Sequence, residues 1–125
     1  MRTRRYRSFR QGPDGAFRRI ALSMPEASES SHMGHPDFRV RGRIFATLGY
    51  PGKGWGMVKL TPEEQREFVQ ERPAAFVPVK GNWGRQGCTS VRLDVCDEET
   101  LGRAITTAWR NAARQKPSRT RGPRA

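Results

Sequence analysis

Residues 38–48, FRVRGRIFATL, have the pattern of a β-hairpin. Apolar residues alternate with arginines as far as Val40, the dipeptide Arg41-Gly42 has the composition of a tight turn, and a second apolar run follows it. A two-residue loop places Val40 opposite Arg43, whereas a three-residue loop places it opposite Ile44. The stretch therefore predicts two antiparallel strands whose register stays open.

The segment that follows predicts a strand and a helix. Residues Trp55–Leu60 read as a strand that ends directly before Thr61-Pro62-Glu63-Glu64. In that tetrapeptide the threonine suits the N-cap, the proline suits the first helical position, and the second glutamate can bond back to the backbone N–H of the cap. We expect the helix to run from Pro62 to about Arg72, because Pro73 disfavours helical backbone in the residue before it.

Similar signals predict the remaining elements. They are a first helix capped by Asp14 and ended by Pro25, a short strand near Ser30–Gly34, strands over Phe76–Val79 and Thr89–Val95, and a last helix capped by Asp97. This order predicts an α+β fold: a single two-layer domain in which an antiparallel sheet with protruding hairpins packs against about three helices. Such a sheet leaves one face open for contact.

The composition limits the class of protein. A chain of 125 residues with 34% hydrophobic residues and 13 glycines has room for one modest core. No apolar run approaches the roughly 18 residues of a membrane span, and no apolar stretch typical of a secretory signal follows the basic N-terminus. The two cysteines read as free thiols. We therefore expect a cytoplasmic protein with no membrane partner.

The net charge of +12 is concentrated at the two ends of the chain. Residues 1–13 and residues 114–125 each carry five basic residues and no acid, which leaves a net charge of +2 on residues 14–113. Arginine mixed with Gly, Pro, Ser and Thr, without an apolar face, predicts two disordered basic arms around one folded domain. Such arms favour polyanions through counterion release, or else they are solvated tails that keep the protein soluble. On the first interpretation the phosphate contacts come from Arg4, Arg5, Arg7, Arg119 and Arg121.

Two internal segments are candidate wings, by which we mean hairpins or loops that protrude from the sheet toward a ligand. The first is the tip of the hairpin over residues 38–48, with Arg39, Arg41 and Arg43. A cation at every second residue suits phosphate contact, and it equally suits a solvent-facing edge that deters aggregation. Lys53, in the next turn, is expected to be exposed on either interpretation.

The second candidate wing is the glycine-rich loop over residues 80–87. Lys80 and Arg85 would contact phosphates there, with Asn82 beside them, while Trp83 would stack on a base. The alternative is that the indole is a core or lid residue and that the glycines only supply turns with positive φ. We favour burial for Trp83 and exposure for Arg85.

Metal and catalytic sites are not indicated by the sequence. His32, His35, Cys88 and Cys96 are conceivable zinc ligands, but the cysteines stand eight residues apart, which is about 26 Å along a strand. The sequence holds no nucleophile-elbow, phosphate-loop or dinucleotide-binding motif. We therefore expect no enzyme activity, no cofactor and no metal.

The sequence resembles the MmcQ/YjbR family of small bacterial proteins over roughly residues 16–113. The resemblance rests on an ordered series of segments, namely Phe17–Pro25, His35–Val40, Ile44–Leu48, Lys59–Gln65, Phe76–Val79 and Gly81–Gly84. It implies a compact α+β domain with a double-wing arrangement and a DNA-binding role, and it brings no catalytic residues. The basic arms depart from the family pattern, as does Cys88, where an aromatic residue is commoner.

These features predict a weakly sequence-specific DNA-binding protein. Its arms would hold phosphates, and its wings would dock in a groove of double-stranded DNA. Two alternatives stay open, a protein-interaction module that uses the open face of the sheet and a protein that binds a small ligand. We favour a monomer.

Overall fold

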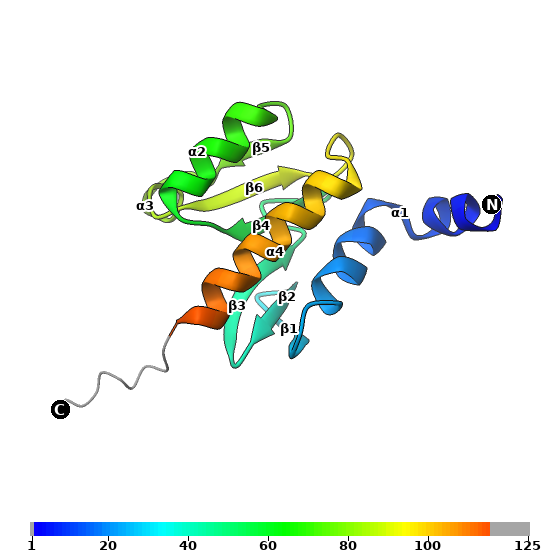
Figure 1. Ribbon diagram of the computed structural model, residues 1–125, viewed down its shortest axis with the longest axis horizontal. Coiled ribbons are helices and arrows are strands. Elements are labelled where there is room, and N and C mark those ends of the chain that lie inside the picture. The colour runs from blue at the N-terminus through cyan, green and yellow to red at the C-terminus, as the bar shows by residue number, and fades with distance from the viewer. Residues whose placement is uncertain (1, 116–125) are drawn as a thin grey trace.

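The computed structural model describes the backbone of residues 2–115 and the side chains of residues 12–115. In chain order the elements are α1 (Arg2–Leu22), β1 (Ala27–His32), β2 (His35–Val40), β3 (Arg43–Leu48), β4 (Trp55–Lys59), α2 (Pro62–Glu71), β5 (Phe76–Pro78), α3 (Asn82–Arg85), β6 (Cys88–Arg92) and α4 (Glu98–Arg114). Figure 1 shows their arrangement, with α4 running across the middle of the molecule.

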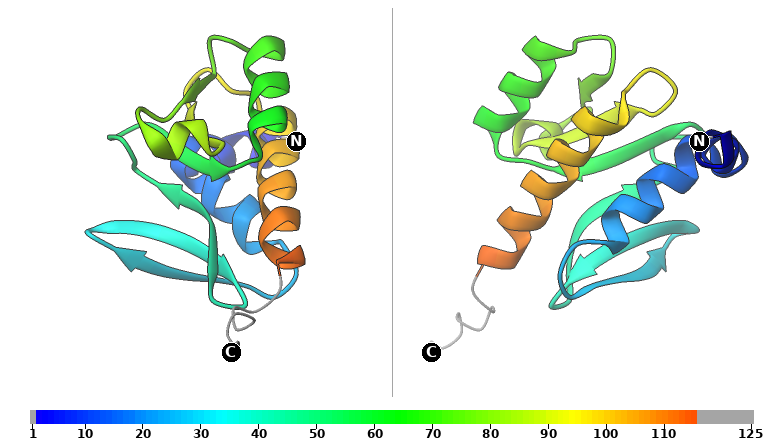
Figure 2. Two further views of the ribbon diagram at one scale, coloured as in Figure 1. Left: turned by 90° about the vertical axis from the view of Figure 1, so that its left-hand side faces the viewer. Right: turned by 45° about the vertical axis from the view of Figure 1, so that its right-hand side comes forward.

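The strands form one antiparallel sheet in the order β1-β2-β3-β4-β6-β5. Helices α1, α2 and α4 cover one face of this sheet, while the single turn of α3 and the β1–β2 hairpin project on the opposite side (Figure 2). The predicted two-layer α+β fold is therefore confirmed. The sequence-based prediction missed only α3, which forms inside the segment interpreted as a loop.

The hairpin of β2 and β3 closes with a two-residue turn. Val40 pairs with Arg43, and both turn residues have positive φ, 54° at Arg41 and 81° at Gly42. This backbone is the type I′ turn that matches the twist of the flanking strands. Farther along, Phe45 is an extra residue between the pairs Arg39–Ile44 and Phe38–Ala46, so it forms a β-bulge. The register left open by the sequence is thus settled, and Arg39 and Ile44 share one face.

Two helix starts match their sequence signals. The Thr61 hydroxyl accepts a hydrogen bond from the Glu64 backbone N–H at 3.1 Å, and the Glu64 carboxylate accepts one from the Thr61 backbone N–H at 2.9 Å. The Asp97 carboxylate accepts one from the Thr100 backbone N–H at 3.0 Å at the start of α4. Both caps satisfy backbone donors that have no partner within the helix, which confirms the predictions.

The core lies between the sheet and its three covering helices. Phe17 of α1 is fully buried, and a Cβ added at Gly56 of β4 would lie 2.5 Å from its ring, so the missing side chain lets the helix approach the strand. From α4, the apolar face supplies Ile105 and Ala108, which are also fully buried. Close packing of this kind places α4 against the middle of the sheet.

The first third of the chain differs from its prediction. The sequence predicts a disordered arm and a helix that begins at Asp14, whereas α1 runs from Arg2 to Leu22 with one break at Gly12, where φ is 68°. Strand β1 begins at Ala27 instead of near Ser30. Its residues after Ala27 are exposed on both sides, so it carries no apolar alternation from which its extent could be predicted. The second predicted arm lies almost wholly in residues 116–125, outside the described residues.

Candidate functional site

The face of the sheet away from the helices has a buried floor. Strand pairing places Asp37, Thr47, Met57 and Ser90 in one row across β2, β3, β4 and β6. At most 4% of each of these residues is exposed, although α1, α2 and α4 cover the other face. Neighbouring side chains therefore shield the row, and His32 and Arg39 do so at Asp37.

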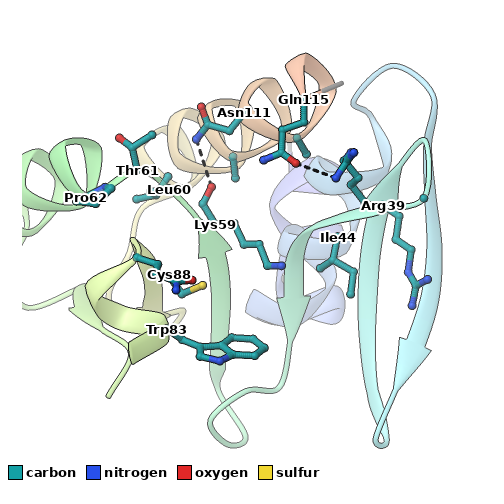
Figure 3. A pocket seen from close by; sticks show the side chains of 15 residues that line it. Arg39, Ile44, Lys59, Leu60, Thr61, Pro62, Trp83, Cys88, Asn111 and Gln115 are labelled. Carbon is teal, nitrogen blue, oxygen red and sulfur yellow. Dashed lines mark hydrogen bonds between the residues drawn. The ribbon is translucent and has the colours of Figure 1, made fainter. Parts of the chain in front are cut away.

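A groove opens at one end of this face because β3 and β4 separate there. Their pairing stops at Ala46 and Val58, which leaves the beginning of β3 and the end of β4 unpaired with each other. The groove has a volume of about 630 Å³. Its lining includes Arg39 and Ile44 from β2 and β3, Lys59 from β4 and Trp83 from α3 (Figure 3). We call it the β3–β4 groove.

The β3–β4 groove holds an unpaired cation beside an exposed indole. The Lys59 ammonium lies 5.9 Å from the centroid of the Trp83 ring, within the range of a cation–π contact. Within the described part of the chain, no carboxylate lies within ion-pair distance of Lys59. Trp83 is 59% exposed, so the favoured prediction that it is buried is wrong.

The local backbone explains why Trp83 faces outward. A Cβ at Gly84 would lie 1.6 Å from the Val79 carbonyl oxygen, and one at Gly87 would lie 1.9 Å from the Leu60 carbonyl oxygen. The Gln65 side chain of α2 also donates a hydrogen bond to the Gly84 carbonyl at 3.0 Å. Two glycines thus let the backbone of α3 press against the sheet, and the bulky indole is left on the solvent side. The glycines serve internal packing and turns here.

Arg39 takes part in a compact network on the same face. Its Nε and Nη2 donate to the Asp37 carboxylate at 2.7 and 3.0 Å, and His32 Nδ1 lies 2.6 Å from the same carboxylate. The Asp37 side chain is fully buried. The hydrogen bond from Arg39 lowers the pKa of Asp37; burial opposes this shift, and the His32 contact supports it. The ion pair with Asp37 uses Nε and Nη2 of Arg39 and does not use Nη1, and the Arg39 side chain is partly exposed.

The two other arginines of the predicted first wing are held against the body of the protein. Arg41 Nε lies 3.2 Å from the Glu26 carboxylate, and its Nη1 donates to the Ala113 carbonyl at 2.9 Å. Arg43 donates to the Gln115 side chain at 3.0 Å. The tip of the β2–β3 hairpin is therefore docked on the C-terminal end of α4. The hairpin that projects is instead β1–β2 (Figure 2).

The remaining predicted site residues do not gather in the β3–β4 groove. Lys53, Lys80, Asn82 and Arg85 are exposed and are not part of its lining. Arg4, Arg5 and Arg7 lie in the first part of α1, whose side chains are outside the described set, and Arg119 and Arg121 lie outside the described residues. Of the thirteen predicted contact residues, the groove brings together Arg39, Arg43 and Trp83.

Lys59 and Ile44 are two of the lining residues that the sequence analysis did not predict. Each stands in an apolar strand pattern, where a lysine or an isoleucine suggests only alternation. The one available signal was that Lys59 interrupts the apolar run from Met57 to Leu60, and it does not reveal a groove.

The candidate zinc ligands stay apart. Among the described residues, no three His, Cys, Asp or Glu side chains form a group that could hold a metal ion. Burial raises the pKa of the Cys88 thiol, while the nearby Lys59 lowers it, and burial raises the pKa of the Cys96 thiol to about 11. Both thiols are therefore poor nucleophiles at neutral pH. Within residues 2–115, none of the helices is long and apolar enough to cross a membrane.

Comparison with known proteins assigns the family. The family model YjbR matches residues 22–111, which covers the sheet and nearly all of α4. The chain belongs to the YjbR family. Among solved structures, this YjbR protein is similar to the crystal structure of Deinococcus radiodurans protein DR2400, described by the family-model domain DUF419. The two share 20% sequence identity and a TM-score of 0.67, over 84% of this chain and 83% of the other. No curated protein matches the sequence.

Proposed function

We propose that this YjbR protein binds nucleic acid, with DNA as the expected form, and that the β3–β4 groove is the contact site of the folded domain. The observation that carries the proposal is the Lys59 ammonium, which has no carboxylate partner in the described chain and lies 5.9 Å from the exposed ring of Trp83. Cations that neutralise phosphates and aromatic rings that stack on bases are the two side-chain types that nucleic-acid sites combine.

The distribution of charge supports the same proposal. The chain carries +12, and ten of its basic residues lie in the terminal segments 1–13 and 114–125. Several cations of the folded part are used internally, as for Arg39 on Asp37 and Arg41 on Glu26. The terminal segments would then supply most of the affinity by contacting phosphates, and phosphate contacts carry little information about base sequence. We therefore expect weak sequence preference.

A pair of substitutions with the same charge change tests the groove. Lys59→Gln removes the groove cation, and Lys53→Gln removes an exposed lysine outside the groove as a matched control. For Lys59→Gln, fluorescence anisotropy with a labelled DNA should show about fivefold weaker binding, equivalent to about 1 kcal/mol for a half-exposed charge contact. The slope of log K against log salt should also fall by roughly 0.7–0.9. Equal effects from both variants would place the contact site elsewhere.

The terminal segments are tested separately in the full-length chain. Arg119→Gln combined with Arg121→Gln should reduce the salt slope for duplex DNA by about two units if both residues contact phosphates. An unchanged slope would show that these residues are solvated tails, and the groove would then have to account for the binding by itself.

A further inference from the structure

We infer that the β3–β4 groove takes an unpaired nucleobase stacked on Trp83, with the adjoining phosphate on Lys59, so that the protein prefers single-stranded nucleic acid to a duplex. This inference rests on the proposed function and states which form of nucleic acid the site fits. A nucleotide joins a flat ring and a negative group through one sugar. The groove presents the complementary ring and positive group with their centres 5.9 Å apart.

Trp83 has the properties of a stacking platform. The residue is 59% exposed, so it offers free surface to a ligand. Its backbone is fixed, because a Cβ at Gly84 would already overlap the Val79 carbonyl and the Gln65 amide donates to the Gly84 carbonyl. An exposed ring on a fixed backbone loses only side-chain freedom when a base stacks on it. In Figure 3 the indole lies below the Lys59 side chain.

The walls of the groove suit a base with its phosphate better than a phosphate alone. Ile44 and Leu60 give apolar surface, and Lys59 and the Nη1 group of Arg39 give positive charge on the same side of the sheet. The lining thus combines apolar side chains with charged and amide side chains, and a volume of about 630 Å³ lies in the usual range of sites that hold a small organic ligand.

The two hairpins at the β1 side of the sheet do not suit a duplex groove. The tip of the β2–β3 hairpin is docked on α4 through Arg41 and Arg43. The projecting β1–β2 hairpin spans residues 27–40, where the sequence has one arginine, Arg39, and no lysine, and Arg39 is paired with the Asp37 carboxylate. Inside a duplex the faces of the bases are also covered by their neighbours, so an aromatic ring in a hollow site can stack only on a base that is already free.

The test compares single-stranded and duplex probes in the full-length protein. Trp83→Ala should weaken binding of a labelled twelve-nucleotide oligothymidylate about 5- to 150-fold, the loss expected for one stacked base. Binding of a duplex of the same length should change less than about twofold. Trp83→Phe keeps a ring and should retain most of the single-strand affinity. Because the indole is exposed, both variants should keep their circular dichroism spectra, which serves as the folding control.

Three other results would overturn the inference, and they are distinguishable from failure of the proposed function. Equal losses for the single strand and the duplex would remove the single-strand preference while leaving nucleic-acid binding in place. Competition by thymidine monophosphate as effective as competition by the oligonucleotide would indicate a mononucleotide site. Failure of the unaltered protein to bind either probe at low salt would remove the proposed function itself.

Discussion

Replacing Gln65 should remove hydrogen bonds that attach α3 and β6 to α2, and so destabilise the fold. Gln65 lies on α2 and is 9% exposed. Its Nε2 donates to the carbonyls of Gly84 and Cys88, both at 3.0 Å, and to the Thr89 hydroxyl at 3.1 Å. One amide therefore joins α2, α3 and β6. Its contact on α3, Gly84, is the chain neighbour of Trp83, whose ring lines the β3–β4 groove. Leucine has a similar volume and no donor, so Gln65→Leu removes the hydrogen bonds without leaving a large cavity.

The expected loss follows from the number of hydrogens and acceptors. An amide has two N–H groups, and the three acceptors share them. Each net hydrogen bond contributes about 1 kcal/mol, and each buried group left unsatisfied costs about 1–3 kcal/mol. We therefore expect Gln65→Leu to lower the free energy of unfolding by about 2–4 kcal/mol. In a chain of this length that corresponds to a fall in Tm of roughly 6–20 °C.

Urea denaturation at neutral pH measures this loss, with Gln70→Leu as a control on an exposed position of the same helix. Gln70→Leu should change the free energy of unfolding by less than about 0.5 kcal/mol. Gln65→Glu adds a check on the cause, because its carboxylate would face three acceptors. The pKa of that carboxylate should be raised, so the destabilisation should grow as the pH rises from 4 to 7. A loss for Gln65→Leu no larger than that for Gln70→Leu would refute the reasoning.

Two further predictions concern the capping box and the buried carboxylate. Thr61→Ala removes the hydroxyl that accepts from the Glu64 backbone N–H, and it should cost about 0.5–2 kcal/mol of unfolding free energy, measured by urea denaturation. Asp37 has a pKa below its ordinary value of 3.8. Its ionised form therefore stabilises the fold at pH values above that ordinary pKa, and this stability is lost as the pH falls through the lowered pKa. Asp37→Asn should therefore be destabilising at pH 7, and its deficit relative to the unaltered protein should shrink below about pH 4. A deficit that is constant between pH 3 and pH 7 would contradict the assignment.

The parts of the fold that the sequence predicts are those governed by neighbouring residues. The Thr61 capping box, the Asp97 cap and the turn at Arg41-Gly42 each depend on a few consecutive residues, and all three are present. Periodicity likewise predicts the buried face of α4 that includes Ile105. The beginning of β1 was not predicted, since this edge strand is exposed after Ala27 and so shows no apolar pattern.

The candidate site depends on contacts between residues far apart in the sequence. Whether Arg41 is available to a ligand is decided by Glu26 and by the Ala113 carbonyl at the end of α4. Trp83 is exposed because α3 is pressed against the Val79 backbone, which no local pattern indicates.

By itself the sequence determined the order of the elements other than α3, the caps of α2 and α4, and the excess of positive charge at both ends, because these follow from local backbone preferences and from counting residues. Only the tertiary structure decided which cations are neutralised internally and which one, Lys59, stands beside an exposed ring. The physical reason is that electrostatic pairing and burial depend on distance in space, and the separation of β3 from β4 that opens the groove is set by the packing of the whole sheet against its helices.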